Sequence, residues 1–336
     1  MTDRETERDV TAALVGLDLA VPGETPTFHR LTGGVASDIW RVDLARGPVC
    51  VKRALGKLRV EADWFAPVER NVYEAEWMRR AGAAVEGATP LLLGQDPASG
   101  VLAMAFLEPD SYPLWKSELL TGEADPEFAA RVATTLGTIH AKTAGDPAIA
   151  RAFPQSEIFH DIRLEPYLLY TAGAHTDLAD ELQNLVGVTA SHKLAMVHGD
   201  ASPKNILMGP DGPVMLDAEC ACHGDPAFDV AFCLNHLLLK CLANPGSIAN
   251  YMTAFERFVA AYQPTISWED PVFFQARAAR LLPGLLLGRV DGKSPVEYLN
   301  SDEDRDLVRR VARALLKNPV NHLIAVARAW RKECES

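Results

Sequence analysis

The sequence predicts an α+β fold with two lobes, a small lobe built on an antiparallel sheet and a larger lobe that is mainly helical. Short β-prone runs separated by turn residues fill roughly the first 108 residues, a pattern typical of strands joined by hairpins. After Glu108 and Pro109, longer segments carry apolar residues at helical spacing. We therefore expect residues 1–108 to form the first lobe and residues 109–336 to form the second.

The small lobe is expected to contain five strands and one helix. Arg46 and Gly47 separate two of the strands, and a turn cluster from Gln95 to Gly100 separates two others. The helix ends at Gly82, because glycine commonly follows the last helical turn. The predicted strands are 28–31, 39–44, 48–52, 89–93 and 101–107, and the predicted helix is 68–81.

The large lobe is expected to be helical except for one polar loop. Two short β-type runs, 194–197 and 214–216, bracket that loop and break the helical pattern. Loops held by regular elements are where catalytic residues concentrate, so chemistry is expected there. The helices predicted from apolar spacing are 126–142, 164–172, 177–186, 227–243, 247–262, 271–287 and 302–316.

Composition excludes several classes of function. A net charge of -12 disfavours binding to nucleic acid or to an anionic membrane surface, because both require a positive face. The same field would help to capture a cationic second substrate. No run of about 18 apolar residues and no secretory leader is seen, so the predicted location is cytoplasmic. The composition does not indicate an oligomeric state.

The polar loop carries oxygen-bearing side chains at a spacing that suits phosphoryl transfer. Asp200 and Asn205 lie in this loop, and Asp217 ends the next short strand. Phosphoryl transfer requires a carboxylate that orients and deprotonates the attacking hydroxyl, and oxygen ligands for the magnesium ions that bridge the phosphates. These three residues supply that set. Taken alone, the loop has a second interpretation as an ordinary turn rich in glycine and aspartate.

The whole pattern resembles the aminoglycoside phosphotransferase and choline kinase group. The motifs that carry the resemblance are His198-Gly199-Asp200, Asn205, Leu216-Asp217-Ala218-Glu219 and Gly224-Asp225-Pro226-Ala227-Phe228-Asp229. The resemblance implies a protein-kinase-like fold and transfer of phosphate from ATP, with Mg²⁺, to a hydroxyl of a small molecule. It implies that Asp200 is the catalytic base and that Asn205 and Asp217 hold Mg²⁺. It also implies that Glu219 reaches the metal or its water shell, that Asp229 fixes the loop, and that His198 is structural.

The small lobe contains matching phosphate-binding parts. Gly33, Gly34 and Ser37 lie between two predicted strands, where backbone amides can cradle phosphate oxygens. Lys52 follows at the end of an apolar strand, where its ammonium group can neutralise phosphate charge. A solvent-exposed lysine is the alternative for this position. Order and spacing of these parts, taken with the polar loop, favour the phosphate-binding interpretation.

Two further parts complete the expected nucleotide site. Glu74, on the predicted helix, is expected to orient the lysine through an ion pair, with Glu76 as the alternative. The adenine base is expected to lie between the lobes against the segment 104–108, where the backbone of Ala105 and Leu107 would pair with it, as in related kinases.

The acceptor side carries a narrower resemblance. The stretch 51–70, with Trp64, resembles the corresponding stretch of methylthioribose kinases, and Arg280 falls in a block that resembles their arginine-bearing helix. The resemblance implies that both residues lie near the acceptor, and Arg289, in a following turn, is a further candidate. A packing role for Trp64 and a solvated helix face for Arg280 are the alternatives. Comparable candidates whose position the sequence does not fix are Asp161, Arg163, Glu165 and Tyr167.

The sequence also departs from methylthioribose kinases. It has Ser202-Pro203-Lys204-Asn205 where they lack the asparagine, and Ala218 where they have proline. Sugars, amino alcohols and hydroxylated antibiotics, including the aminoglycoside class, therefore stay open as acceptors. A catalytically silent nucleotide-binding scaffold is the alternative class of protein. A protein kinase is disfavoured, because no Ala-Pro-Glu segment follows Asp217.

Overall fold

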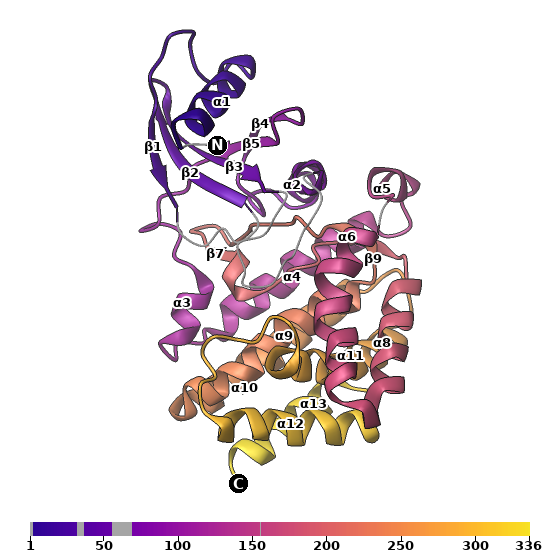
Figure 1. The fold of residues 1–336 in the computed structure, drawn as a ribbon. Helices are drawn as coiled ribbons and strands as arrows, with labels where there is room; N and C mark the ends of the chain where they lie inside the picture. Colours follow the sequence, from indigo (N-terminus) through magenta and orange to yellow (C-terminus); the bar gives the residue numbers. More distant parts are fainter. Residues whose placement is uncertain (1–2, 32–36, 56–68, 155) are drawn as a thin grey trace.

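The computed structural model describes residues 3–31, 37–55, 69–154 and 156–336. Figure 1 shows a sheet with its two helices at one end of the molecule and a larger helical body at the other, with the two termini at opposite ends. The predicted α+β class, with a small antiparallel sheet followed by a mainly helical part, is therefore confirmed. Gly33, Gly34 and Trp64 lie outside the described residues.

The sheet has five antiparallel strands in the order β1-β2-β3-β5-β4. The first three strands form a meander that carries Lys52 near the end of β3. The pairing of β4 with β5 is irregular between Leu92 and Gly94, and β4 begins three residues later than the predicted 89–93 run. The strands are β1 Thr27–Arg30, β2 Ser37–Leu44, β3 Gly47–Ala54, β4 Leu92–Asp96 and β5 Val101–Ala105.

Each face of the sheet packs against a different part of the molecule. Along β5, Val101 and Ala103 join an apolar cluster with helix α1, Asp3–Gly16. The alternate residues, Leu102 and Met104, join the main core with helix α2, Arg70–Ala84. This alternation follows from the period of two in a β-strand. Helix α1 was not predicted, because only a few apolar side chains interrupt its charged sequence.

The large lobe contains the predicted long helices and several shorter ones. Four of them, α4, α5, α9 and α11, begin with an aspartate that caps the second helical amide and a proline at the first turn, a strong local start signal. The helices are α3 Trp115–Leu120, α4 Pro126–Thr143, α5 Pro147–Ala152, α6 Glu157–Phe159, α7 Tyr170–Ala174, α8 Ala179–Ser191, α9 Pro226–Ala243, α10 Ile248–Tyr262, α11 Pro271–Asp291, α12 Asp302–Lys317 and α13 Leu323–Cys334.

The predicted helix 164–172 is helical in the structure, but most of it belongs to a π-helix that continues into α7. Residues His160–Leu169 form a π-helix that contains Pro166. Proline has no backbone N–H and clashes with the preceding helical turn, so a regular α-helix is disfavoured at this point. The wider turn brings Arg163 against the backbone of the polar loop, where its Nε donates to the carbonyl of Gly199 at 2.7 Å.

Helix α9 is the central helix of the large lobe. Among the described residues it is the one helix long and apolar enough to cross a membrane by length and composition, but 89% of that stretch is buried inside the protein. Burial of this kind is expected for a core helix, so its composition is weak evidence for a membrane span. Its first turn supports the polar loop through Asp229.

Two small antiparallel ladders frame the polar loop. Strand β6, Ala195–Val197, pairs with β9, Cys222–Gly224, and β7, Ile206–Met208, pairs with β8, Pro213–Met215. Strands β6 and β8 lie within one residue of the predicted runs, whereas β7 and β9 were not predicted. The two ladders hold residues 198–205 and 217–221 as adjacent loops.

Candidate functional site

The loop between β6 and β7 has a backbone that only glycine allows. Gly199 has φ +76°, and a Cβ atom at this position would lie 2.6 Å from the carbonyl oxygen of Cys220. A side chain would therefore be both strained and without space. The next residue, Asp200, donates its amide to Nδ1 of His198, and Nε2 of that ring lies 3.0 Å from the carbonyl of Leu216. This network assigns a neutral ring with its proton on Nε2, and burial lowers the pKa of His198.

Asp229 fixes this loop from helix α9. Its two carboxylate oxygens accept hydrogen bonds from the backbone amides of His198, at 2.6 Å, and Gly199, at 2.8 Å. His140 lies 3.2 Å from the same carboxylate and 2.7 Å from the hydroxyl of Tyr262. All of these groups are buried. The arrangement is the one that the resemblance implied for Asp229.

We expect Asp229→Asn to destabilise the protein by about 3 kcal/mol. The amide side chain presents an N–H group to a backbone N–H, so one buried amide loses its partner and the buried charge-assisted bonds are lost. Urea denaturation followed by circular dichroism measures this change. A free energy of unfolding within about 0.5 kcal/mol of the wild-type value, the range of a neutral surface change, would contradict the role given to Asp229.

Asp200 lies at the end of this loop with one oxygen held and the other nearly free. The guanidinium of Arg163 and the ammonium of Lys204 lie 2.7 and 2.9 Å from its Oδ2. Among the described residues, its Oδ1 accepts one side-chain hydrogen bond, from the hydroxyl of Ser202 at 3.4 Å. Burial would raise the pKa of Asp200, but the two cations outweigh burial and lower it. The carboxylate is therefore ionised, oriented and able to accept a proton or hydrogen bond through Oδ1.

Asn205 and Asp217 face the same cavity from neighbouring loops. The amide nitrogen of Asn205 donates to the carbonyl of Asp200 at 3.1 Å, which turns its oxygen away from the loop. Asp217 has φ +63°, a left-handed conformation that aspartate tolerates better than most residues. An amide oxygen and a carboxylate are the hard ligands that Mg²⁺ prefers, so this pair fits a magnesium site.

Lys52 connects the two lobes. Its ammonium lies 2.7 Å from Glu74 of α2 and also contacts Asp217 of the large lobe. Burial would lower the pKa of Lys52, but the two carboxylates outweigh burial and raise it. Glu74 shares the ammonium of Lys52 with Asp217. Burial raises the pKa of Glu74 to about 7. Glu76, the alternative partner, instead pairs with two arginines on its own helix.

Glu219 has a different partner from the one expected. Its Oε2 accepts a hydrogen bond of 2.9 Å from Nε of Arg70, the first residue of α2. This ion pair joins residues 149 apart in the sequence and forms a second link between the lobes. Glu219 is not among the residues that line the cavity described next. For its predicted metal role, Glu219 therefore has the oxygen that does not accept the hydrogen bond from Arg70, or it contacts only the water molecules around the metal.

A cavity of about 410 Å³ opens between the sheet and the helical lobe. Apolar side chains from both lobes form one part of its wall, and charged and amide groups form the other. The polar groups that line it are Lys52, Glu74, Lys116, Lys204, Asn205 and Asp217. The apolar groups include Leu31, Ile39, Trp77, Met78, Met104, Leu114, Met215 and Leu216. The cavity has the size and mixed lining of a site for a small ligand.

The predicted adenine contacts lie at the edge of this cavity. Met104 lines it, whereas Ala105 and Leu107 do not. The amide of Ala105 is already bonded to the carbonyl of Leu91 at 2.8 Å. In the described residues Leu107 has no backbone hydrogen bond, so it is the better placed of the two to pair with a base. Ser37, at the start of β2, is buried and its hydroxyl has no partner among the described groups.

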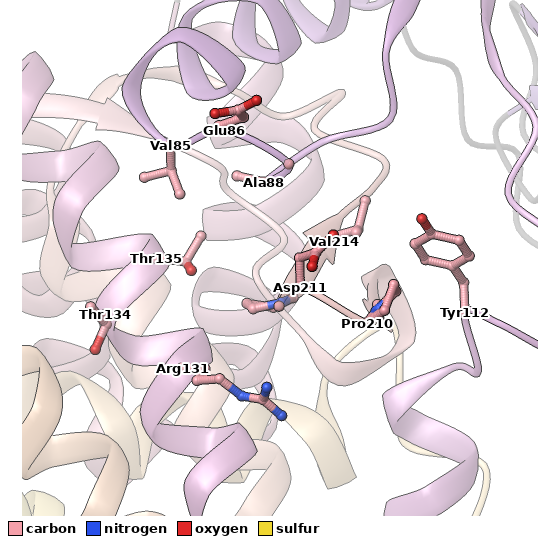
Figure 2. A pocket seen from close by; sticks show the side chains of 14 residues that line it. Val85, Glu86, Ala88, Tyr112, Arg131, Thr134, Thr135, Pro210, Asp211 and Val214 are labelled. Carbon is pink, nitrogen blue, oxygen red and sulfur yellow. The ribbon is translucent and has the colours of Figure 1, made fainter.

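A second cavity, of about 250 Å³, lies on another side of the β7–β8 hairpin. Figure 2 shows Arg131 and Thr134 of α4, Asp211 of the hairpin turn, and Tyr112 around it. None of the predicted site residues lines this cavity. Of these two cavities, the one between the lobes is the one that brings together Lys52, Glu74, Asn205 and Asp217.

The two arginines predicted on the acceptor side lie in different surroundings. Arg280 is exposed and its guanidinium donates to Asn321 at 2.9 Å. Arg289 is buried against Tyr167, whose hydroxyl lies 3.0 Å from its Nη1. Among the described residues, Arg280 contacts none of the groups named above, whereas Arg289 contacts Tyr167, itself a candidate for the acceptor side. Arg289 is therefore the better candidate of the two arginines.

Sequence reasoning did not assign three basic residues that the structure brings to the site. Arg163 was only one of several candidates, because its contact with Asp200 depends on the π-helix. Lys204 stands four residues after Asp200, a spacing that was visible but unused. Lys116, at the start of α3, lines the cavity and pairs with Glu297. No sequence signal marks Lys116, because its element is only six residues long.

The comparisons with known proteins agree with this geometry. Residues 27–271, well over half of the chain, match the model of the phosphotransferase enzyme family, APH. Methylthioribose kinase 2 of Oryza sativa subsp. japonica is 23% identical over 262 residues, which cover 69% of this chain and 61% of that enzyme. The match thus spans less than two thirds of that relative's length.

Solved structures share the fold at low sequence identity. A choline/ethanolamine kinase family protein from Mesorhizobium loti has a TM-score of 0.53 at 19% identity, covering 98% of this chain and 94% of its own. Spectinomycin phosphotransferase, solved with ADP and spectinomycin, has a TM-score of 0.54 at 13% identity, covering 97% and 98%. The predicted protein-kinase-like fold is confirmed, and with the family match it shows that this chain belongs to the phosphotransferase enzyme family.

Proposed function

We propose that this chain transfers the γ-phosphoryl group of ATP to a hydroxyl group of a small molecule. The observation that carries the proposal is the ion-pair chain Glu74–Lys52–Asp217, which joins the lobes beside Asn205 and the oriented Asp200. The kinases to which the chain is similar act on small molecules by name, including methylthioribose kinase 2 and spectinomycin phosphotransferase. The predicted cytoplasmic location stays a prediction.

Asp200 is the proposed base. Its Oδ1, which receives one long hydrogen bond from Ser202, also accepts the hydrogen bond of the acceptor hydroxyl, whose oxygen attacks phosphorus while the bond from phosphorus to the ADP oxygen breaks. The hydroxyl proton passes to Asp200 as the new oxygen–phosphorus bond forms. Since Arg163 and Lys204 hold Oδ2, the carboxylate keeps one orientation, and positioning of this kind supplies much of the catalysis in phosphoryl transfer.

Lys52 is proposed to balance charge on the nucleotide phosphates, and Leu107 to pair with the adenine. Asn205 and Asp217 would hold Mg²⁺, which neutralises phosphate charge when bound. Glu219 is proposed as a group of the metal's water shell. Ser37 brings an unpaired hydroxyl to the start of β2, where the glycines of the same turn are proposed to cradle phosphate oxygens.

A panel assay tests the proposal. Purified protein is incubated with ATP, Mg²⁺ and single hydroxyl compounds, comprising thiosugars, amino alcohols, hydroxy acids and hydroxylated antibiotics, and products are detected by mass spectrometry. A mass increase of one phosphate group on an acceptor, lost in Asp200→Asn, is the expected result. A protein that binds ATP but phosphorylates no member of any class would instead favour the nucleotide-binding scaffold.

A further inference from the structure

Two buried cations in the large lobe have no carboxylate partner in the described part of the chain. Lys240, in the last turn of α9, is 1% exposed, and its ammonium lies over the ring of Tyr298, 4.5 Å from the ring centre. Arg289, near the end of α11, is 9% exposed. Its Nη1 bonds to the hydroxyl of Tyr167 and to Ser294, but its Nε has no partner.

These cations are costly in a protein of this composition. The chain has 45 acidic and 33 basic residues, so carboxylates for pairing are plentiful. An uncompensated buried charge costs several kcal/mol. Burial, with the positive charge of Lys116, lowers the pKa of Lys240 to about 7. Burial, with Arg289 and Lys240, lowers the pKa of His236 well below its usual value. A cluster that destabilises the fold in this way is a candidate functional site.

A line of contacts connects the cluster with the proposed base through Arg163 and Phe232. Phe232, His236 and Lys240 follow each other at four-residue spacing on one face of α9. The guanidinium of Arg163, which binds Asp200, lies over the ring of Phe232, 5.9 Å from its centre. The face of α9 that carries Lys240 therefore also carries Phe232, which packs against Arg163, the partner of Asp200.

A second line of contacts runs in the same direction. Tyr167 follows Arg163 by four residues on the π-helix and bonds to Arg289. The ring of Tyr167 also packs on Phe232, with ring centres 5.4 Å apart. On the other side, His236 lies 3.3 Å from the hydroxyl of Tyr298. Lys240, His236 and Arg289 therefore lie between α9, α11 and the segment after α11.

One carboxylate reaches this cluster, and it does so from outside. Glu297 pairs with Lys116, a residue of the cavity wall beside Lys204. Burial alone would raise the pKa of Glu297, but its pKa is lowered, and Lys116 and Arg289 contribute to this lowering. Its side chain is 62% exposed, so it belongs to the rim, not to the buried cluster. Lys116 is therefore the residue through which the cavity adjoins the cluster, although Lys240 and Arg289 do not themselves line the cavity.

We propose that the acceptor carries an anionic group, a carboxylate or a phosphate monoester, which Lys240, Arg289 and Lys116 bind while its hydroxyl reaches Asp200. This inference rests on the proposed function and narrows its acceptor class. The overall negative charge favours a cationic acceptor at long range, whereas the local charge of this cluster has the opposite sign. A buried, water-excluded site strengthens the local attraction.

Titration calorimetry on the nucleotide-free protein tests the site without requiring turnover. The probes are gluconate for the carboxylate and glycerol 3-phosphate for the phosphate, with glycerol and choline as neutral and cationic hydroxyl compounds. We expect at least one anion to bind more tightly than glycerol and choline, and Lys240→Met to weaken that binding at least tenfold. The identity of the probe that binds shows whether the site takes a carboxylate or a phosphate group.

Lys332→Met is the matched control, because it removes the same charge from an exposed position on α13. It should leave anion binding unchanged. Lys240→Met should keep or raise the midpoint of thermal unfolding, since it replaces an unpaired buried ammonium by an apolar chain of similar length. Equal binding of anionic, neutral and cationic probes, or equal loss in both variants, would overturn the anion site.

The panel assay separates this inference from the proposed function. Turnover of neutral or cationic acceptors without anion binding would reject the anionic acceptor and keep the kinase. Anion binding that depends on Lys240, without phosphorylation of any hydroxyl compound, would reject the kinase and keep the anion site.

Discussion

Asp200→Asn is expected to reduce the turnover number on the order of a thousandfold, with little change in the KM for ATP. The substitution keeps the size of the side chain but removes its charge and its ability to take a proton, and a general base contributes about 10²- to 10⁴-fold. Asp200 is not among the residues lining the cavity that would hold the nucleotide. Steady-state kinetics with the acceptor identified by the panel assay measures both constants.

The pH dependence gives a second check on this assignment. The pKa of Asp200 lies below its ordinary value because of Arg163 and Lys204, so the carboxylate stays ionised as pH falls and is protonated only below its usual range, near pH 4. The loss in Asp200→Asn should therefore be the same at about pH 6 and about pH 8. A loss that disappears at the lower pH would show that another group is the base.

Stability has to be measured with the same variant. Removing the charge of Asp200 leaves the buried Arg163 without its carboxylate, and we expect a lower midpoint of thermal unfolding. Asp180→Asn, a change at an exposed position of α8, is the control for loss of a carboxylate. Retention of wild-type turnover by folded Asp200→Asn would reject the role of this residue.

The parts of the fold that the sequence predicts are those with local physical signals. The predicted starts of α4, α9 and α11 lie within one residue of the observed ones, and an aspartate cap followed by proline marks each of these starts. The loop of Asp200 was predicted from the two short β-type runs that bracket it, which is also a local signal. Lys52 and Glu74 were predicted by their order and spacing, and the structure pairs them.

What the sequence did not predict depends on distant contacts. Arg163 meets Asp200 from a π-helix that contains Pro166, and Arg70 meets Glu219 across 149 residues. The buried state of Lys240 is equally invisible in the sequence, where a lysine in the last turn of a helix is an ordinary surface residue. Arg289 was a candidate without a partner, and only the packing against Tyr167 gives it a place.

Asp217→Asn is expected to reduce turnover on the order of a thousandfold and to raise the Mg²⁺ concentration needed for half-maximal rate. Asparagine also tolerates a positive φ, so the conformation at +63° should be preserved while the charge is lost. Lys52 keeps Glu74 as its partner at 2.7 Å. Loss of one preorganised charged group at a transferring phosphoryl centre costs about 10²- to 10³-fold in rate. Kinetics over a series of Mg²⁺ concentrations measures both effects.

The matched control for this variant is Asp211→Asn, which removes the same charge from the exposed turn of the neighbouring β7–β8 hairpin. It should leave the Mg²⁺ dependence unchanged, because Asp211 lines the second cavity and not the one that holds Lys52. If high Mg²⁺ restored full turnover to Asp217→Asn, the side chain would act only in metal affinity. If turnover were normal at every Mg²⁺ concentration, the carboxylate that joins the two lobes through Lys52 would have no part in the reaction, and the ion-pair chain would be a structural link alone.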